Sequence, residues 1–144
     1  MYKRQPAHQL VIYGKAPVAE ALKKLAPQFG WATEIANEDS EPTISGTLVV
    51  TVVATQGNQD LKALSAAINS RPAFISFVGS KKKFSSLKEK LVKGGCAATD
   101  LKNVKAPAGL DIGAVTPEEI SLSILAELLQ VRKNFRNGVY DKDS

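Results

Sequence analysis

Cysteine and histidine are almost absent from this chain of 144 residues, which has one of each, Cys96 and His8. A single cysteine cannot form an intramolecular disulfide, and one cysteine with one histidine cannot supply the ligands of a Cys/His zinc site. A hydrolytic Ser/His/Asp or Cys/His arrangement would have to use His8, close to the start. The composition therefore disfavours a disulfide scaffold, a structural zinc site and classical hydrolysis, and it favours a reducing cytoplasm.

Long apolar runs and aromatic side chains are also scarce. No run approaches the roughly 20 apolar residues of a membrane-spanning helix, and the start MYKRQPAHQ lacks the apolar segment of a signal peptide. Aromatic residues make up 6% of the chain and are not placed for base stacking. We therefore expect a soluble, cytoplasmic protein with no membrane partner, and nucleic acid is disfavoured as a partner.

Positive charge is concentrated in one segment. The formal net charge is +5, and the segment Gly79–Gly95 contains six lysines but only one acidic residue, Glu89. Such a patch suits an anionic ligand or partner. For Lys88, Lys90 and Lys93 a solvated helix face is the simpler interpretation.

Short β-branched runs alternate with stretches in which apolar residues recur at helical spacing. Strands are predicted at Gln9–Tyr13, Trp31–Ala36, Leu48–Ala54, Ala73–Val78 and Leu101–Lys105. Helices are predicted from Pro17 to about Gly30, over Asn58–Asn69 and Lys82–Lys93, and after Thr116. This alternation predicts an α/β fold: a Rossmann-like, doubly wound, mainly parallel five-stranded sheet with helices on both faces.

The length of the chain matches one domain, so we predict a single domain over residues 1–144. Residues 1–8 and 134–144 are expected to be poorly ordered. The polar segment 37–47 (NEDSEPTISGT) joins the second and third strands and barely reaches the roughly dozen residues that a helical crossover needs. We expect this crossover to be reduced, with its helix shortened or missing.

The last helix has the clearest start signal. Thr116 is in position to cap it, Pro117 follows as the first helical residue, and Glu119 completes a capping-box pattern. In the first two helices the apolar stripes include Phe29 and Leu61, which are therefore expected to face the core.

Three stretches in order carry a family resemblance: GSKKK (Gly79–Lys83), APAGLDIGAVTPEEI (Ala106–Ile120) and SLSILAELL (Ser121–Leu129). They resemble the signature of the C-terminal domain of the XdhC/CoxI family, the xanthine dehydrogenase accessory proteins. The likeness extends from Leu10 to about Arg132, and the second stretch is its most specific part.

The resemblance implies an accessory factor for molybdenum hydroxylases of the xanthine dehydrogenase or carbon monoxide dehydrogenase type. Such a factor binds molybdenum cofactor (molybdopterin) or its nucleotide form and delivers it to the hydroxylase apoenzyme, its partner. Whether the chain is also an enzyme stays open, with binding favoured over catalysis. Typical members carry a further N-terminal domain, and a separate chain that supplies this domain is one possible partner. A homodimer is the other possibility that the sequence leaves open.

The candidate cofactor-binding residues follow the predicted strands, on the edge of the sheet where ligands of doubly wound folds bind. They are Gly14, Lys15, Ala16, Thr55, Gly79, Ser80, Lys81, Gly109, Asp111 and Gly113. Glycine turns before helix starts suit phosphate, lysines supply charge, and Asp111 can accept a hydrogen bond from a pterin or a ribose. The simpler alternatives are a plain turn, a capped helix start and an Asx turn, with Asp60 stabilising the first turn of its helix.

An NAD(P)-binding oxidoreductase or redox-sensing domain is the alternative function, because this fold often binds nicotinamide dinucleotides. A ribose-binding acid would then be Glu34, Glu38 or Asp39. Two departures count against this alternative. Ala16 replaces the glycine that lets a pyrophosphate approach the backbone, and Pro17 removes one N–H from the helix start.

Overall fold

A computed structural model describes residues 8–37, 48–57 and 59–138 of the chain. In chain order the elements are strand β1 (His8–Tyr13), helix α1 (Pro17–Leu25), the 3₁₀ helix η1 (Ala26–Phe29), β2 (Trp31–Ala36), β3 (Leu48–Val53), α2 (Asp60–Asn69), β4 (Phe74–Phe77), α3 (Lys81–Lys93), α4 (Ala98–Leu101), β5 (Val104–Lys105) and α5 (Pro117–Arg136). The predicted elements are confirmed, with differences at their ends that matter most in β5.

The five strands form one sheet in the order β2-β1-β3-β4-β5, and all neighbouring strands are parallel. This is one of the two common strand orders of doubly wound sheets. The chain leaves β1 toward one side to form β2, and β3 lies on the other side of β1. The topological switch point therefore lies between β1 and β3. The crossover predicted to be reduced falls at 38–47, outside the described residues.

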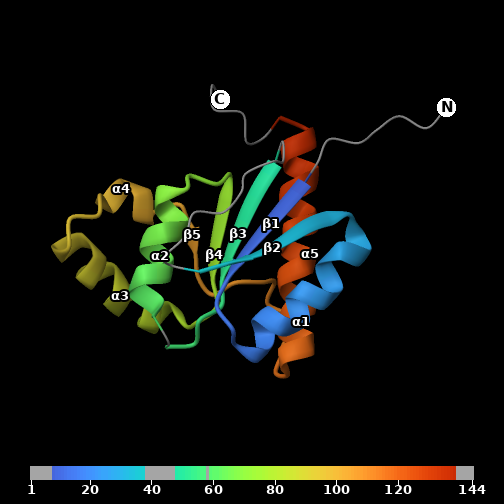
Figure 1. Cartoon of the computed structure of the whole chain (residues 1–144), viewed down its shortest axis with the longest axis horizontal. Coiled ribbons are helices and arrows are strands. Elements are labelled where there is room, and N and C mark those ends of the chain that lie inside the picture. The colour runs from blue at the N-terminus through green and yellow to red at the C-terminus, as the bar shows by residue number, and fades with distance from the viewer. Residues whose placement is uncertain (1–7, 38–47, 58, 139–144) are drawn as a thin grey trace.

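Helices cover both faces of the sheet, as predicted (Figure 1). Alternate residues of β1 belong to different cores: Leu10 and Ile12 pack in one with residues of α1 and α5, and Val11 and Tyr13 pack in the other with residues of α2 and α3. The strict alternation of side chains along a strand makes this division possible. The doubly wound α/β fold is thus confirmed.

Three details of the predicted elements are wrong. The fifth strand is limited to Val104–Lys105, because Leu101 ends the short helix α4 and is buried in the helical layer. Phe29 is 44% exposed because it lies in η1, whose tighter winding turns it away from the buried stripe of α1. Leu61, the second residue of α2, is 37% exposed, whereas other residues of this helix, such as Ala63, are buried in the core.

At both ends of the described chain, secondary structure includes residues from the segments that were expected to be poorly ordered. His8 belongs to β1 and is buried, and α5 continues to Arg136, beyond the point where the tail was expected to begin. Arg132 holds this end of α5 against the chain just before and within β2. Its Nη1 donates to the Phe29 carbonyl at 2.7 Å, and its guanidinium lies 5.3 Å from the Trp31 ring centroid. These are tertiary contacts that the polar sequence of this segment does not reveal.

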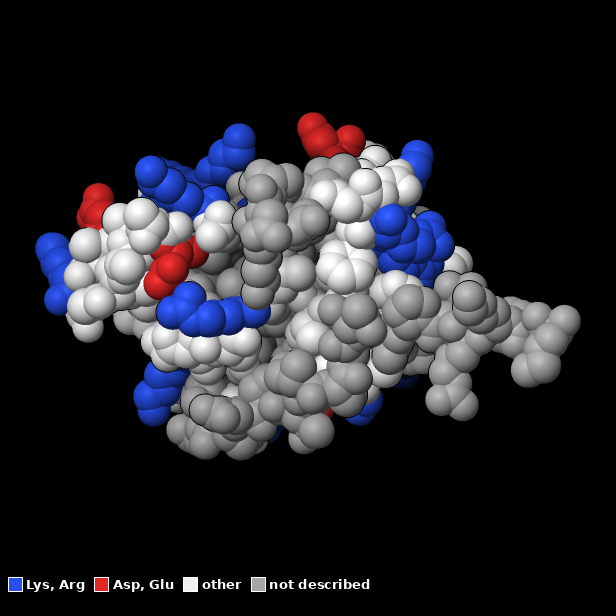
Figure 2. Space-filling view, turned by 90° about the horizontal axis from the view of Figure 1, so that it is seen from above, with Lys and Arg blue, Asp and Glu red and all other residues white. Residues whose placement is uncertain are grey.

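Figure 2 views the amino-terminal edge of the sheet, where α5 ends, and lysine and arginine side chains lie in several separate groups around this face. His8 begins β1 at this edge. Burial lowers the pKa of His8, and the nearby positive charges of Arg132 and Arg136 lower it further. The single imidazole of the chain thus lies at the opposite edge of the sheet from the loops that carry the predicted site.

Candidate ligand-binding rim

The described residues line two hollows along the rim that the carboxyl ends of the parallel strands form. The first, the switch-point crevice, has a volume of about 560 Å³ and is lined by Gly14, Lys15, Ala16, Ile35, Ala36, Asn37, Thr55, Gln56 and Gln59. The second, the β4–α5 cavity, has a volume of about 790 Å³ and is lined by Val78, Gly79, Lys81, residues 105–114, Ile120, Ser123 and Glu127. Both volumes suit a small organic ligand.

The predicted site residues are divided between the two hollows. The crevice contains Gly14, Lys15, Ala16 and Thr55. The cavity contains Gly79, Lys81, Gly109, Asp111 and Gly113. Ser80 is in neither set of lining residues. The predicted site residues that line a hollow are thus divided between the crevice and the cavity.

The turn after β1 lies directly against the end of β3. Gly14 has φ +118°, and a Cβ atom there would be 2.1 Å from the carbonyl oxygen of Ala54. The Ala54 N–H donates to the Tyr13 carbonyl at 2.7 Å, which fixes the two strand ends together. Only glycine fits this approach, because both partners are backbone and neither can move aside.

The start of α1 opens on the crevice without a side-chain cap. Ala16 is the N-cap residue, its methyl group offers no acceptor, and Pro17 follows. The positive end of the helix dipole and the free first-turn N–H groups are therefore available to an anion. Lys15 is the one charged side chain among the described residues that line the crevice. This combination suits a phosphate.

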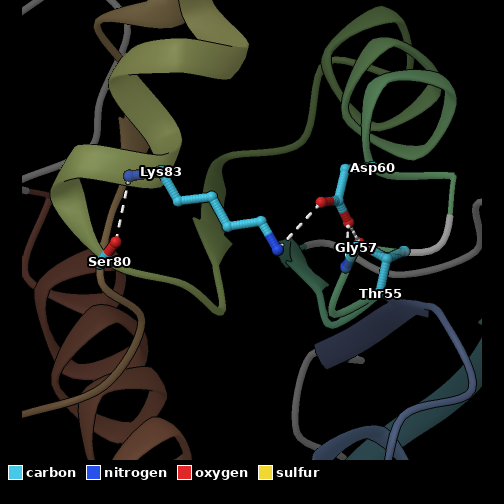
Figure 3. Close-up of polar contacts among 5 residues, drawn as sticks. All are labelled: Thr55, Gly57, Asp60, Ser80 and Lys83. Atoms are coloured by element: carbon cyan, nitrogen blue, oxygen red, sulfur yellow. Dashed lines mark hydrogen bonds and ion pairs between the residues drawn. The ribbon is translucent and has the colours of Figure 1, made fainter.

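The loop on the other side of the crevice is held by Asp60. This buried carboxylate accepts hydrogen bonds from the Thr55 hydroxyl and, at 3.0 Å, from the Gly57 N–H, and it pairs with Lys83 Nζ at 3.2 Å (Figure 3). The Thr55 proton is thus committed to Asp60, and Thr55 positions the loop. Asp60 joins this loop to α3, a wider role than the predicted stabilisation of one helix turn.

The start of α3 is capped as the sequence suggested. The Ser80 side chain accepts a hydrogen bond from the Lys83 N–H at 3.0 Å (Figure 3). Gly79 is required by packing, because a Cβ atom there would lie 2.4 Å from a ring carbon of the buried Phe77. Lys81, the first helical residue, lines the β4–α5 cavity together with Gly79.

A polar network that the sequence did not reveal fixes the loop of the β4–α5 cavity. Glu127 of α5 accepts the Gly109 N–H at 2.9 Å and pairs with Lys105 Nζ at 2.5 Å. Lys105 Nζ also donates to the Gly109 carbonyl at 2.6 Å. The one available signal was a glutamate within an apolar helix stripe, and a surface position explained it equally well. Glu127 is in fact buried.

The start of α5 differs from that of α1 because its own side chains close it. Thr116 Oγ1 accepts the Glu119 N–H at 3.1 Å, and Glu119 Oε1 accepts the N–H groups of Val115 at 2.8 Å and Thr116 at 3.2 Å. These backbone hydrogen bonds lower the pKa of Glu119. The predicted capping box is confirmed, and it occupies the N–H groups of Val115, Thr116 and Glu119.

Among the described residues, no group of three or more His, Cys, Asp or Glu side chains could hold a metal ion. Cys96 is half-buried, and its Sγ lies 3.8 Å from the Ala97 carbonyl oxygen. Of the acids suggested for a ribose, Glu34 accepts a hydrogen bond from Gln9 at 3.3 Å. Glu38 and Asp39 lie outside the described residues. No helix in the described parts of the chain is long and apolar enough to cross a membrane.

Comparison with known proteins agrees with this architecture. The model of the XdhC Rossmann domain family matches residues 10–128. Two Escherichia coli (strain K12) proteins are similar: the uncharacterized protein YqeB, 37% identical over 65% of this chain and 17% of YqeB, and the molybdenum cofactor insertion chaperone PaoD, 27% identical over 89% of this chain and 41% of PaoD.

A solved structure shares the fold. The crystal structure of a xanthine dehydrogenase from Bacillus halodurans has a TM-score of 0.67 at 22% identity, and the match covers 90% of this chain and 44% of that chain. The chain spans less than half the length of each of these three proteins.

Proposed function

The chain belongs to the XdhC Rossmann domain family, and we propose that it is an accessory factor that binds molybdenum cofactor or its nucleotide form. In this role it aids insertion of the cofactor into the apoenzyme of a molybdenum hydroxylase of the xanthine dehydrogenase or carbon monoxide dehydrogenase type. The similarity to the insertion chaperone PaoD over 89% of this chain supports the proposal. The cofactor is cargo here, and the hydroxylase apoenzyme is the partner.

The observation that carries the binding step is the uncapped start of α1 at the topological switch point. Ligands of doubly wound folds bind at this position, and the crevice there combines an open helix N-terminus with Lys15. We assign the phosphate of the ligand to this crevice, beside Gly14 and Ala16. Lys81, on the neighbouring cavity, adds positive charge to the same rim.

A binding role agrees with the distribution of reactive groups. His8, at the start of β1, lies at the edge of the sheet opposite the rim. General acid or base chemistry by an imidazole is therefore not supported on the rim. A carrier needs tight and reversible contacts with its cargo and no catalytic group, and the two hollows suit that requirement.

The test is equilibrium binding of the nucleotide form of the cofactor to the purified chain and its variants. Lys15→Gln should bind roughly tenfold more weakly, because it removes the charge that pairs with the phosphate. Lys81→Ala should weaken binding by a smaller factor, because it removes positive charge from the same rim. Lys93→Ala, on the exposed last turn of α3, is the matched control and should bind as the unchanged chain does. Gly79→Val is a poor probe, because its side chain would displace Phe77.

Unchanged affinity in both lysine variants would contradict the proposal that the phosphate of the ligand binds at the rim. Insertion is measured separately, as recovery of activity when an apo hydroxylase is mixed with the cofactor and the loaded chain. Recovery should be faster with the chain than with free cofactor. Equal rates would argue against an insertion role even if binding is confirmed.

The alternative is an NAD(P)-binding oxidoreductase or redox-sensing domain, since the same crevice would take a dinucleotide. Ala16 and Pro17 weaken this alternative, because a methyl group replaces the close backbone approach and one N–H is missing at the helix start. Calorimetry with NAD(H) and NADP(H) decides between the two. Submicromolar affinity together with hydride transfer to an acceptor would replace the carrier function.

A further inference from the structure

The two hollows of the rim differ in charge. Lys15 is the charged residue of the switch-point crevice, whereas two lysines and two carboxylates line the β4–α5 cavity: Lys81, Lys105, Asp111 and Glu127. Most other side chains of this cavity are apolar, such as Leu110 of its loop. A charge-balanced, largely apolar hollow favours a neutral ring over a phosphate, because an anion would lose water and meet no net positive charge.

Lys105 offers one directed hydrogen-bond donor to this cavity. A lysine ammonium has three N–H groups. Glu127 takes one at 2.5 Å and the Gly109 carbonyl takes another at 2.6 Å. These two contacts fix the position of Nζ, and the side chain, 41% exposed, lines the cavity. The third N–H is thus pre-positioned to donate to a carbonyl oxygen of a ligand.

Asp111 offers the complementary acceptor. It lines the same cavity, on the loop between Gly109 and Gly113, and has no hydrogen-bond or ion-pair partner among the described residues. A carboxylate only accepts hydrogen bonds, so it selects N–H groups. Glu127 is buried and each of its oxygens already has a partner, Gly109 or Lys105, so Asp111 is the more accessible acceptor.

From these contacts we propose that the β4–α5 cavity binds a planar heterocycle with a ring carbonyl next to a ring N–H, the cyclic amide of a pterin or of a 6-oxopurine. Lys105 donates to the carbonyl and Asp111 accepts from the N–H. The proposal rests on the proposed function and deepens it: the crevice takes the phosphate end of the cargo and the cavity takes its ring. A cavity of about 790 Å³ has room for such a ring.

The experiment titrates the full chain with free pterin, followed by its fluorescence. The matched probe is the diamino analogue, in which an amino group replaces the ring carbonyl and so presents donors to Lys105. Pterin should bind, and the diamino analogue should bind roughly tenfold or more weakly, because a charge-assisted hydrogen bond is lost. Guanosine in a parallel titration reports whether a purine ring is preferred.

Two variants test the residues. Asp111→Ala changes an exposed side chain, so the fold is kept, and pterin affinity should fall roughly tenfold. The double variant Lys105→Met with Glu127→Gln removes both charges together, which avoids leaving a buried carboxylate unpaired. It should lose the preference for pterin over the diamino analogue. Lys102→Met, at an exposed position just before β5, is the control and should keep that preference.

Equal affinity for pterin and its diamino analogue, or wild-type affinity in both cavity variants, would overturn the ring assignment. If pterin fails to bind while the cofactor nucleotide still depends on Lys15, this inference fails and the proposed function stands. If pterin binds with the expected dependence on Lys105 and Asp111 but the cofactor nucleotide does not bind, the proposed function fails. Guanosine binding with the same dependence would support the cavity chemistry and assign it to a purine.

Discussion

The switch-point crevice and the β4–α5 cavity are built with the same device. A buried carboxylate accepts an N–H of a loop that borders each hollow and pairs with a lysine whose side chain is 41% exposed. The pair is Asp60 with Lys83 beside the crevice, and Glu127 with Lys105 at the cavity. A buried carboxylate is costly unless it is paired and hydrogen-bonded, so each pair fixes its loop in one position.

The two regions differ in what they leave open. At the crevice, α1 begins without a side-chain cap, whereas next to the cavity the side chains of Thr116 and Glu119 form a capping box at the start of α5. We therefore expect a helix start on the rim to bind an anion only where the chain does not cap it itself. The following predictions test this contrast.

The largest expected effect is from Gly14→Ala, which should lower the free energy of unfolding by roughly 3 kcal/mol or more, because its Cβ would meet backbone atoms of β3. Gly109→Ala should cost less, since its Cβ would mainly meet the Ser123 hydroxyl, which can rotate. Gly113→Ala, with φ +77° and open space, should cost about 1 kcal/mol. Urea unfolding measures all three, and equal costs would contradict the packing difference.

Removing the buried carboxylates comes next. Asp60→Ala leaves the buried Thr55 hydroxyl and the Gly57 N–H without their acceptor, and it should cost roughly 2 to 4 kcal/mol. Glu127→Ala removes one N–H acceptor and one ion pair, and should cost somewhat less. Lys62→Ala, on the exposed side of α2, is the control. If both carboxylate variants unfold at the same urea concentration as this control, the two pairs do not fix the loops.

Giving α1 the cap that α5 already has would sharpen the comparison. Ala16 has the extended backbone of an N-cap residue, so Ala16→Asp should stabilise the chain by about 1 kcal/mol. The same carboxylate would occupy the N–H groups that a phosphate needs, and binding of the cofactor nucleotide should weaken. Thermal unfolding and equilibrium binding are measured on the same sample. Greater stability with unchanged binding would show that the phosphate does not use the start of α1.

The smallest effect concerns the pH dependence of the α5 cap. The folded-state pKa of Glu119 is lowered from 4.5 by the N–H groups of Val115 and Thr116. The ionised form is therefore favoured by folding, and its contribution to stability is present above pH 4.5 and is lost as the pH falls through the lower folded-state pKa. The unfolding free energies of the wild type and of Glu119→Gln should converge at low pH. A constant difference would contradict this cap.

Several features of the fold follow from local sequence. β3 is continuously apolar and β-branched, and the capping-box residues of α5 are close neighbours in the chain, so short-range patterns determine both. The glycine of the first turn was also predictable, since a backbone turn next to a parallel strand needs one. Nothing local distinguishes Glu127, whose partners Lys105 and Gly109 are brought to it by folding.

The sequence by itself determined the alternation of strands and helices, the starts of α3 and α5, and the set of loops that line the rim, because each depends on residues near one another in the chain. Only the tertiary structure decided that the predicted site residues divide between a crevice and a cavity and that Thr55 and Ser80 make internal hydrogen bonds. It also decided that the start of α1 lacks a side-chain cap, whereas α5 has one. The physical reason is that a hydrogen-bonding group can serve a ligand only if no other part of the folded chain has already satisfied it.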